Sequence, residues 1–400
     1  MEFLSHLLRL SAATVFCGGL LTACADSAPE DSGSGEASVE AAGKRLLYVG
    51  TYTKAEPHVR GGAEGIYQMA MDEQSGELQM QGVTIDAVNP SFVAVHPNGR
   101  YLYAVNEVGT DVAPAGWITA FRIDPEVPRP IQLNRHSSRG LAPCHLAVEG
   151  TGRYLLVANY ADGVVSVLPI QNDGKLRPSS DSITLRGSGP HPQQKSSHPH
   201  MICLSPDNEL VYVPDKGSDR IWAFRLDHQR GALIPAPAAG AEVQPGAGPR
   251  HLTVHPSGRF AYRINELDNT VNAYTRAAGS GALTELQRIS TLPDHFEGKS
   301  YCADIHVSPD GRFLYGSNRG HDSIVIYAID ADSGRLTLVG HEATRGEFPR
   351  NFMISPNGNY LYVANQNSDN IVAFQRDAKS GELTLQTQYG VPTPVCLTVR

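Results

Sequence analysis

The chain reads Pro249-Arg250-His251-Leu252-Thr253-Val254-His255-Pro256-Ser257-Gly258-Arg259-Phe260-Ala261-Tyr262, and this phrase ends at Asn265-Glu266. Similar phrases begin at Pro90, Pro143, Pro199, Cys302 and Pro349. A shortened seventh phrase is divided between residues 394–399 and residues 47–52. A repeat of about fifty residues with two strands per phrase is typical of a radial array of small β-sheets. In such an array the repeat makes the structure, so function is expected where one copy differs from the others.

Each repeat predicts four strands. Turns such as His255-Pro256-Ser257-Gly258 separate the first strand from an aromatic-rich second strand, because Pro presets φ and Gly accepts the left-handed position. A second turn precedes the fourth strand, and in one copy Pro128-Arg129-Pro130 takes its place. The other copies carry a turn glycine: Gly76, Gly174, Gly231, Gly281, Gly334 and Gly381. Six glycine turns and one degenerate turn indicate seven units.

The divided repeat predicts how the ring closes. Strand 394–399 would pair beside strand 46–51, so both ends of the chain share one sheet and no edge stays open. We therefore predict an all-β fold, a seven-bladed β-propeller closed by pairing of the N- and C-terminal strands in one blade. This domain covers residues 45–400.

Composition limits the partners. The formal net charge is −8, and an acidic chain without a basic stretch would be repelled by phosphate backbones, so no nucleic acid is expected. The sequence predicts no cofactor and no metal. A monomer is compatible with it, although the oligomeric state is left open.

The N-terminal residues resemble an export signal. Residues 10–21 are mostly apolar but too short for a convincing membrane span, and Leu21-Thr22-Ala23-Cys24 resembles a bacterial lipobox. We predict a lipoprotein signal peptide over 1–23, then a lipidated Cys24 and a disordered tether over 24–44. An ordinary cleaved signal is the alternative. Ala25 favours the outer membrane, so the protein would sit on the periplasmic face of the envelope and touch the membrane only through its lipid.

Four cysteines remain outside Cys17 and Cys24. All lie on first strands of four different units: Cys144, Cys203, Cys302 and Cys396. Buried free thiols are the favoured interpretation, with a disulfide as the alternative.

Two columns of the aligned repeats vary in chemistry. One follows the opening Pro and contains Ser91, Cys144, His200, Arg250, Ala303, Arg350 and Val395. The other ends the second strand and contains Tyr52, Glu107, Tyr160, Lys216, Glu266, Arg319 and Gln366. The two strands are antiparallel, so both columns should meet around one mouth of the central channel. His200, Arg250 and Glu266 are the candidate catalytic residues; Arg319, Arg350, Lys216 and Glu107 are candidates for substrate binding. The alternative is a solvent-exposed rim whose ion pairs have no functional role.

A neighbouring column is nearly constant: Thr51, Asn106, Asn159, Asp215, Asn265, Asn318 and Asn365. A calcium-binding ring would use such residues, but a side chain present in most copies is expected to bond backbone at the strand end. His96 and His255 occupy the turn and should be structural. His145, His251 and His306 lie on first strands and should be packed beside the site.

These residues also resemble a known family. Tyr48-Val49-Gly50-Thr51-Tyr52, the run 246–251, Asn265-Glu266-Leu267 and the run 303–311 are similar to the propeller-type lactonases, which include bacterial 6-phosphogluconolactonase and 3-carboxy-cis,cis-muconate lactonizing enzyme. The resemblance implies a site of His200, Arg250, Glu266 and Arg319. One departure is Ser197-His198-Pro199-His200, where the family often has Cys-His.

The resemblance implies hydrolysis of a small-molecule lactone bearing a carboxylate or phosphate, or of a sugar lactone, in carbohydrate metabolism. Arg250 and Arg319 would hold the anionic group and the oxyanion, with His200 as the favoured base and Glu266 orienting it or touching substrate. No Gly-Xaa-Ser-Xaa-Gly elbow points to a serine nucleophile. The alternatives are a muconate-type cycloisomerase, a metal-dependent lactonase and a non-enzymatic envelope scaffold. Export also fits poorly with a phosphorylated substrate.

Overall fold

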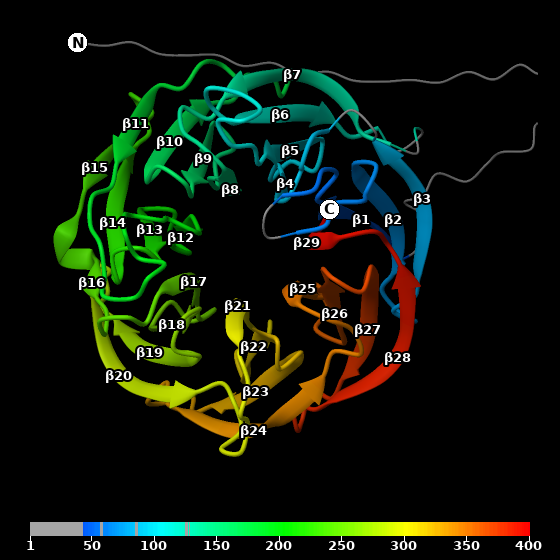
Figure 1. Ribbon diagram of the computed structural model, residues 1–400, viewed down its shortest axis with the longest axis vertical. Helices are drawn as coiled ribbons and strands as arrows, with labels where there is room; N and C mark the ends of the chain where they lie inside the picture. The colour runs from blue at the N-terminus through cyan, green and yellow to red at the C-terminus, as the bar shows by residue number, and fades with distance from the viewer. Residues whose placement is uncertain (1–42, 57–58, 85–86, 125–126, 128) are drawn as a thin grey trace, which may run out of the picture. The chain divides into compact units, whose positions relative to one another are not determined.

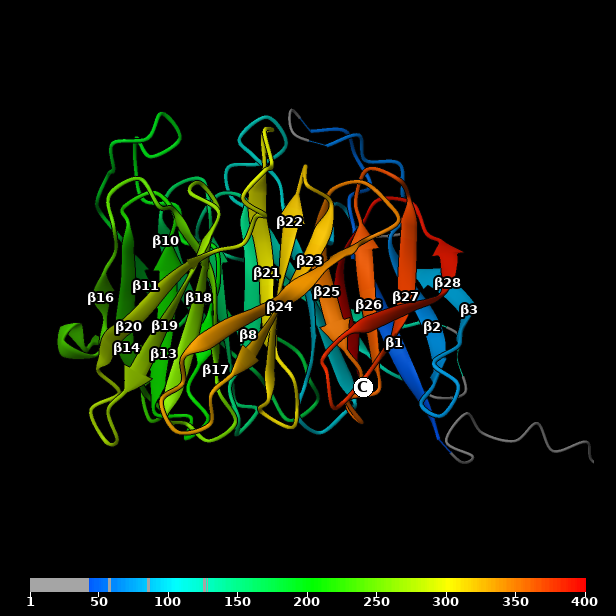
Figure 2. The ribbon, with the colours of Figure 1, turned by 90° about the horizontal axis from the view of Figure 1, so that it is seen from below.

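The computed structural model describes residues 43–56, 59–84, 87–124, 127 and 129–400. These residues form seven antiparallel sheets arranged around a central axis, as Figure 1 shows. Seen from the side in Figure 2, the strands run roughly along that axis. The predicted seven-bladed β-propeller is confirmed. Residues 1–23, Cys24 and Pro128 of the degenerate turn lie outside the described residues, and the predicted tether is described only from Gly43.

Every sheet contributes one strand to each of four concentric positions (Figure 1). The innermost strands are β4 (Val93–Val95), β8 (Pro143–Val148), β12 (Cys203–Leu204), β17 (Pro249–Val254), β21 (Tyr301–Val307), β25 (Pro349–Ile354) and β29 (Pro394–Val399). The second strands are β1 (Lys44–Thr51), β5 (Tyr101–Asn106), β9 (Tyr154–Asn159), β13 (Leu210–Asp215), β18 (Phe260–Asn265), β22 (Phe313–Arg319) and β26 (Tyr360–Asn365).

The third strands are β2 (Ile66–Asp72), β6 (Trp117–Arg122), β10 (Val164–Pro169), β14 (Arg220–Asp227), β19 (Thr270–Arg276), β23 (Ser323–Ile329) and β27 (Asn370–Arg376). The outer strands are β3 (Leu78–Thr84), β7 (Ile131–Ser137), β11 (Asp181–Thr184), β15 (Ala232–Pro235), β20 (Leu283–Ser290), β24 (Leu336–Ala343) and β28 (Leu383–Gly390). One blade adds a short turn of 3-10 helix, Pro237–Ala239, and a fifth strand, β16 (Ala241–Glu242), which the repeat did not predict.

The ring closes as expected. β29 pairs antiparallel with β1, with Leu47 opposite Val399, so one sheet contains strands from both ends of the domain. β1 begins at Lys44, the last residue assigned to the tether. Among the described residues, no helix is long and apolar enough to cross a membrane.

The repeated tyrosine and the repeated turn glycine join neighbouring blades. The Tyr103 hydroxyl donates to the Gly174 carbonyl at 3.0 Å, and that of Tyr262 donates to the Gly334 carbonyl, also at 3.0 Å. Gly174 has a φ of +80°, and a Cβ there would lie 2.2 Å from Tyr101. Glycine is therefore required both by the backbone and by the neighbouring ring. Equivalent bonds start from Tyr212, Tyr315 and Tyr362.

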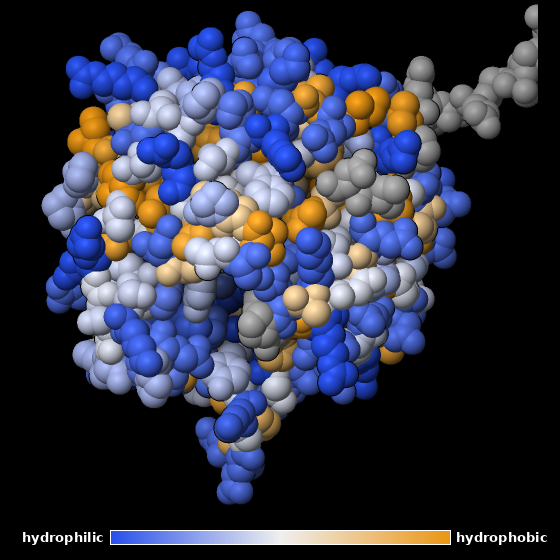
Figure 3. Space-filling view, turned by 45° about the horizontal axis from the view of Figure 1, so that its top comes forward, coloured by the Kyte–Doolittle hydropathy of each residue, from blue (hydrophilic) through white to orange (hydrophobic). Residues whose placement is uncertain are grey.

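Apolar side chains fill the spaces between blades. The second strands are buried on both faces, as in β5 and β26, whereas outer strands such as β28 are largely exposed. The large hydrophobic clusters join adjacent blades, whereas a small one, made of Tyr52, Val59 and Val395, lies within the closing blade. Figure 3 shows mainly hydrophilic side chains on the outside, with hydrophobic ones scattered among them. The four predicted thiols are buried and free.

A β-bulge follows the opening proline in several inner strands. In β17, Pro249 lies opposite Asn265 and His251 lies opposite Ile264, so Arg250 is an extra residue without an opposite partner. The same register shift leaves Cys144 extra in β8 and Arg350 extra in β25. A bulge redirects the extra side chain out of the alternating pattern of the sheet. Here it presents the variable column to the channel.

The residue before the opening proline anchors the second variable column. Ala142 and Phe348 have φ values of +51° and +64°, and Gly248 has +67°. The Gly248 carbonyl accepts the N–H of Glu266 at 2.7 Å, and the Ala142 carbonyl accepts that of Tyr160 at 2.9 Å. The repeated backbone geometry thus fixes the positions of Tyr160 and Glu266, although their side chains differ.

Candidate functional site

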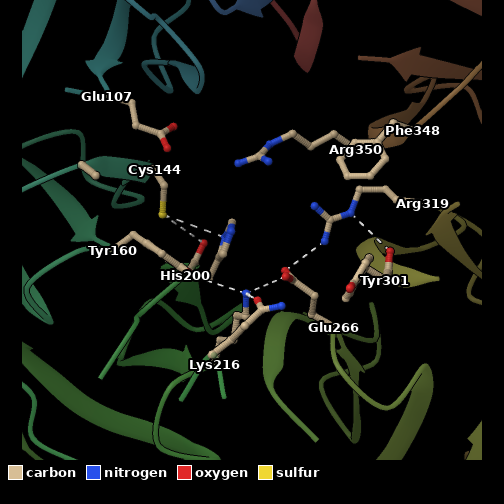
Figure 4. Close-up of a pocket in the computed structure, with 12 residues that line it drawn as sticks. Glu107, Cys144, Tyr160, His200, Lys216, Glu266, Tyr301, Arg319, Phe348 and Arg350 are labelled. Carbon is tan, nitrogen blue, oxygen red and sulfur yellow. Dashed lines mark hydrogen bonds and ion pairs between the residues drawn. The ribbon is translucent and has the colours of Figure 1, made fainter. Parts of the chain in front are cut away.

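The two variable columns meet in one cavity of about 530 Å³ on the propeller axis. It is lined by Glu107, Ala142, Cys144, Tyr160, Gln193, His200, Lys216, Glu266, Tyr301, Arg319, Phe348 and Arg350 (Figure 4). The predicted meeting of the columns at one end of the channel is therefore observed. Six of the seven predicted site residues line this cavity.

Arg250, the seventh, lies in an adjoining smaller space that shares Cys144, His200 and Arg350 with the main cavity. Its guanidinium still reaches the main site, because Nε lies 3.1 Å from Glu266 Oε2. Arg250 is only 2% exposed. Burial, together with the nearby Arg319 and Arg350, lowers the pKa of Arg250 to about 9, so it stays charged at neutral pH.

Glu266 is the charge centre of the cavity. Its Oε1 accepts a hydrogen bond from Lys216 Nζ at 2.6 Å, while Oε2 lies 3.0 Å from Arg319 Nη2. With Arg250, three cations from three different blades surround one carboxylate. Burial alone would raise the pKa of Glu266, but Lys216, Arg319 and Arg250 hold it well below its usual range. The group is therefore ionised and a poor proton acceptor.

His200 is buried and uncharged at neutral pH. Burial lowers its pKa well below 6.5, and the positive charges of Arg250, Arg350 and Lys216 lower it further. Its Nδ1 lies 3.9 Å from Cys144 Sγ, and its ring meets that of Tyr160 edge-on at 5.5 Å. Among the described contacts, Glu266 bonds cations rather than His200, so the expected orienting bond between them is not seen.

Arg350 is the cation with the most unused hydrogen-bonding capacity. Within the described residues its side chain makes one hydrogen bond, from Nη2 to the Tyr52 hydroxyl at 3.3 Å. The Tyr52 hydroxyl in turn donates to Glu107 Oε2 at 2.8 Å, and Ser91 donates to the same oxygen. Figure 4 shows the Arg350 guanidinium extending across the cavity toward Glu107. Arg350 can therefore receive an anionic group from a ligand without giving up an ion pair.

Lys216 is more fully occupied than Arg350. Besides Glu266, its ammonium group donates to Gln193 Oε1 at 2.9 Å and to the Tyr160 hydroxyl at 3.2 Å. An ammonium group has three protons, so these three acceptors satisfy it. The Tyr160 ring stacks on His198 with 4.6 Å between ring centres. This side of the cavity is held rigid.

Arg319 also donates most of its hydrogen bonds to other groups of the protein. Its Nε donates to the Tyr301 carbonyl at 3.2 Å and its Nη2 to the Cys302 carbonyl at 2.9 Å. The Phe348 ring lies 5.0 Å from its guanidinium carbon. Arg319 is therefore locked in place against Glu266, and its charge acts from a fixed position.

Most of the near-constant asparagine column bonds backbone, as predicted, whereas Asn265 Nδ2 donates to the side chains of Thr270 and Asn272. Asn159 Nδ2 donates to the carbonyls of Ser138 and Val164, and Asn318 Nδ2 donates to that of Thr291. In the part of the chain that the structure describes, no group of three or more His, Cys, Asp or Glu side chains is arranged to hold a metal. The turn histidines His96 and His255 bond carbonyls of the next blade.

Sequence analysis missed several lining residues because they lie outside the aligned columns. Gln193 comes from the long connection between β11 and β12, Tyr301 is the first residue of β21, and Phe348 directly precedes β25. Tyr160 stands in the charged column, but as an uncharged residue it was not selected. Because Tyr160 shares an aligned column with Glu107, Lys216 and Glu266, that column could have identified it as a lining residue.

Comparison with known proteins gives consistent matches. A family model described as a lactonase with a seven-bladed β-propeller matches residues 46–399. A 6-phosphogluconolactonase of Bacillus subtilis (strain 168) is 36% identical over 310 residues, which cover 78% of this chain and 85% of the relative. One from Formosa agariphila is 38% identical over 313 residues, covering 77% of this chain and 86% of the relative.

A solved structure, the periplasmic gluconolactonase of Pseudomonas aeruginosa, superposes with a TM-score of 0.83 at 35% identity. The match covers 89% of this chain and 99% of that one. At 35% identity over most of both chains, the likeness extends from the arrangement of the blades to the amino-acid sequence itself.

Proposed function

The chain belongs to the family of lactonases with a seven-bladed β-propeller, and from this premise we propose that it hydrolyses a sugar lactone in the central cavity. The observation that carries the proposal is the cluster of cations around Glu266. Lys216, Arg250, Arg319 and Arg350 outnumber the two carboxylates of the cavity, so the site carries a net positive charge. Such a site stabilises an anionic substrate and the oxyanion that forms when water attacks a lactone carbonyl.

We place the acidic or polar tail of the substrate at Arg350, because this guanidinium is the least committed of the four. A fixed charge aimed at a developing oxyanion contributes several kcal/mol in a water-poor site. The oxyanion would face Arg250 and Arg319, whose positions Glu266 holds. Glu266 thus acts mainly as the counter-charge that keeps the cations together.

His200 is the better candidate for the base that takes a proton from the attacking water. It is neutral at pH 7, so a ring nitrogen can accept a proton. Glu266 is a poor base by comparison, because three neighbouring cations stabilise its ionised form. Its low pKa reduces its basicity in the resting site, but negative charge on the bound oxyanion raises that pKa as the reaction proceeds. The base is therefore strongest when it is needed.

A panel of δ- and γ-sugar lactones, with and without phosphate, and of muconates tests this function by pH-stat on the fragment from residue 43. Glu266→Gln and His200→Gln should each lower kcat/KM by about 100-fold, in the range of single catalytic groups. Parent-like rates in both variants would refute the mechanism. No turnover of any lactone would refute the function and favour a binding scaffold, and turnover of muconates alone would favour the cycloisomerase.

We also propose that the protein acts in the cell envelope, anchored through Cys24. The lipobox-like Leu21-Thr22-Ala23-Cys24 supports this location, as does the likeness to a periplasmic gluconolactonase. An envelope enzyme would meet sugar lactones without phosphate. Incorporation of labelled palmitate into the parent but not into Cys24→Ser, with release of the variant from membranes, is the expected result. Equal labelling of both proteins would exclude the anchor.

A further inference from the structure

Arg250 is supported from the side opposite Glu266. Its Nη1 donates to the Ala303 carbonyl at 2.6 Å and approaches His251 Nε2 at 3.2 Å. His251 is itself buried, and its Nδ1 lies 2.8 Å from Asp304 Oδ1. A chain of contacts therefore runs from Asp304 through His251 to Arg250 and on to Glu266. Neither Asp304 nor His251 lines the main cavity.

Asp304 accepts an unusual number of hydrogen bonds. Besides His251, its oxygens take donors from His306 Nε2 at 3.0 Å, Asn351 Nδ2 at 2.5 Å and the backbone N–H of Ile305 at 2.9 Å. Burial would raise the pKa of Asp304, but His306 and His251 hold it well below its usual range. Asp304 is therefore an anion fixed between β17, β21 and β25.

This anion determines which nitrogen of His251 carries the proton. A carboxylate can only accept, so Nδ1 must be the donor, and in a neutral ring Nε2 is then left with its lone pair. That lone pair faces Arg250 Nη1, which can only donate. Burial and the Arg250 charge lower the pKa of His251 to about 4, so the ring stays neutral at pH 7. The other tautomer would point an N–H at the guanidinium.

We propose that Asp304 and His251 are positioning residues for catalysis: they hold the guanidinium of Arg250 in the orientation that the oxyanion requires. The inference rests on the proposed function for its effect on rate, but the tautomer of His251 is a property of the resting protein. Arg is long and flexible, and a displacement of about 1 Å at a reacting centre can lower a rate by about 100-fold. Glu266 touches only Nε, so the far end of the guanidinium is held at Nη1 by the Ala303 carbonyl together with His251 Nε2, and the second of these contacts depends on Asp304.

Four variants separate positioning from simple stabilisation. Asp304→Asn keeps the shape but removes the charge that selects the tautomer, and it should lower kcat by about tenfold or more with less change in KM. His251→Leu removes the acceptor and should do the same. His251→Gln offers an amide oxygen near the former Nε2 and should recover at least part of the rate. Glu149→Gln is the matched control, because Glu149 is another buried carboxylate with several donors, in a turn far from the cavity lining; it should keep the parent kcat.

Ring ¹⁵N spectra of histidine-labelled protein provide a readout independent of turnover. His251, identified by the signal missing in His251→Gln, should be protonated on Nδ1 in the parent. In Asp304→Asn the share of this tautomer should fall, because the carboxylate is gone and Arg250 Nη1 becomes the main group that favours it. If the parent turns over no lactone, the proposed function fails while the spectra still decide the tautomer. The inference is overturned if the His251 ring carries its proton on Nε2 in the parent, or if Asp304→Asn is destabilised like Glu149→Gln but keeps the parent kcat.

Discussion

At the scale of single residues, Glu266 serves the site through its charge. Its two oxygens are shared among Lys216, Arg250 and Arg319, all buried with it. Buried ions are costly to bring out of water, and this cost is offset only while the partners remain together. Removing one member therefore changes both the stability of the fold and the direction in which the cations point.

Glu266→Gln should lower the free energy of unfolding by about 3–5 kcal/mol, because three buried cations lose their counter-charge. Urea denaturation measures this value, alongside the loss of lactone hydrolysis. The control is Glu242→Gln, whose carboxylate pairs with Arg220 while 84% exposed; a change below about 1 kcal/mol is expected there. Equal stability losses in the two variants would contradict the central role of Glu266.

Buried histidines make stability depend on pH. Burial, more than any neighbouring charge, lowers the pKa of His145, His200 and His251 below 6.5. The unfolded chain binds protons on these rings near pH 6.5 and the folded chain does not, so their contribution is complete above that pH and is lost below it. The raised pKa of His306 acts in the opposite direction, since the contribution of that ring is lost as pH rises.

The free energy of unfolding should therefore fall between pH 7 and pH 5, by at most about 1.4 kcal/mol per pH unit for each of these rings. Urea midpoints at half-unit pH intervals measure the slope. His200→Gln should reduce the slope by the share of one ring. A midpoint that stays constant or rises as the pH falls over this range would show that these rings are accessible to protons in the folded protein.

Sequence reasoning selected the charged site residues because they break the symmetry of the repeat. Glu107, Lys216, Glu266 and Arg319 change from blade to blade, and repetition gives no reason for them. It could not give their pairing, because three blades contribute to the Glu266 cluster and distances between blades are not encoded in the spacing. Gln193 belongs to a loop without an aligned equivalent, so no comparison between copies could select it. Phe348 stands at the position before the opening proline, which was not among the columns compared.

At the scale of the strand, position matters more than side-chain identity. The bulge after the opening proline turns Cys144, Arg250 and Arg350 toward the channel in three different blades. The residue before that proline holds the end of the second strand through its carbonyl. Both devices are backbone features, so substitutions that disturb the backbone should affect the site even when they touch no ligand.

A pair of substitutions at equivalent positions tests this expectation. Gly248→Ala places a Cβ 2.6 Å from Leu267 at a φ of +67°, so it should cost about 1–3 kcal/mol and reduce kcat by displacing Glu266. Ala142→Gly, at a φ of +51°, relieves a left-handed alanine and should leave stability unchanged or raise it by up to about 1 kcal/mol. Thermal unfolding and pH-stat rates distinguish the two. If Gly248→Ala keeps the parent stability and kcat, the backbone at residue 248 does not determine the position of Glu266.

The strand pattern itself was largely predictable. Pro, Gly and aromatic residues recur at fixed places, and their turn and packing preferences predict four strands per blade. The bulges were not predictable, because a bulge depends on the pairing register of two strands, and the extra residues Cys144, Arg250 and Arg350 share no residue type that would mark it. The 3-10 turn and β16 interrupt the outer edge of one blade, where the segment 236–248 is rich in Ala, Gly and Pro and matches no other copy.

At the scale of the molecule, closure of the ring depends on β29. This strand supplies the inner position of the sheet that begins with β1, and Val395, Cys396 and Leu397 are buried in it. Without it, β1 would present an unpaired edge and the neighbouring blades would lose their apolar contact. The propeller therefore behaves as one cooperative unit rather than as seven independent sheets.

Removing residues 394–400 should lower the free energy of unfolding by more than about 5 kcal/mol, a large part of the stability of a typical domain. Differential scanning fluorimetry and size-exclusion chromatography would show a lower melting temperature and aggregation through the open edge. Leu385→Thr, at a side chain 45% exposed on β28, is the control and should change little. A truncated protein that melts with the parent would show that the ring holds without its closing strand.

The bulge also bears on how such a protein changes over generations. Because the backbone directs whatever residue follows the proline toward the axis, a single codon change there alters what the pore presents while the hydrophobic packing between blades stays the same. Three such positions, at Cys144, Arg250 and Arg350, lie in three different sheets. At Cys144 and Arg350, which make no ion pair among the described residues, new substrate preferences can thus arise by drift at single codons without disturbing the charges around Glu266.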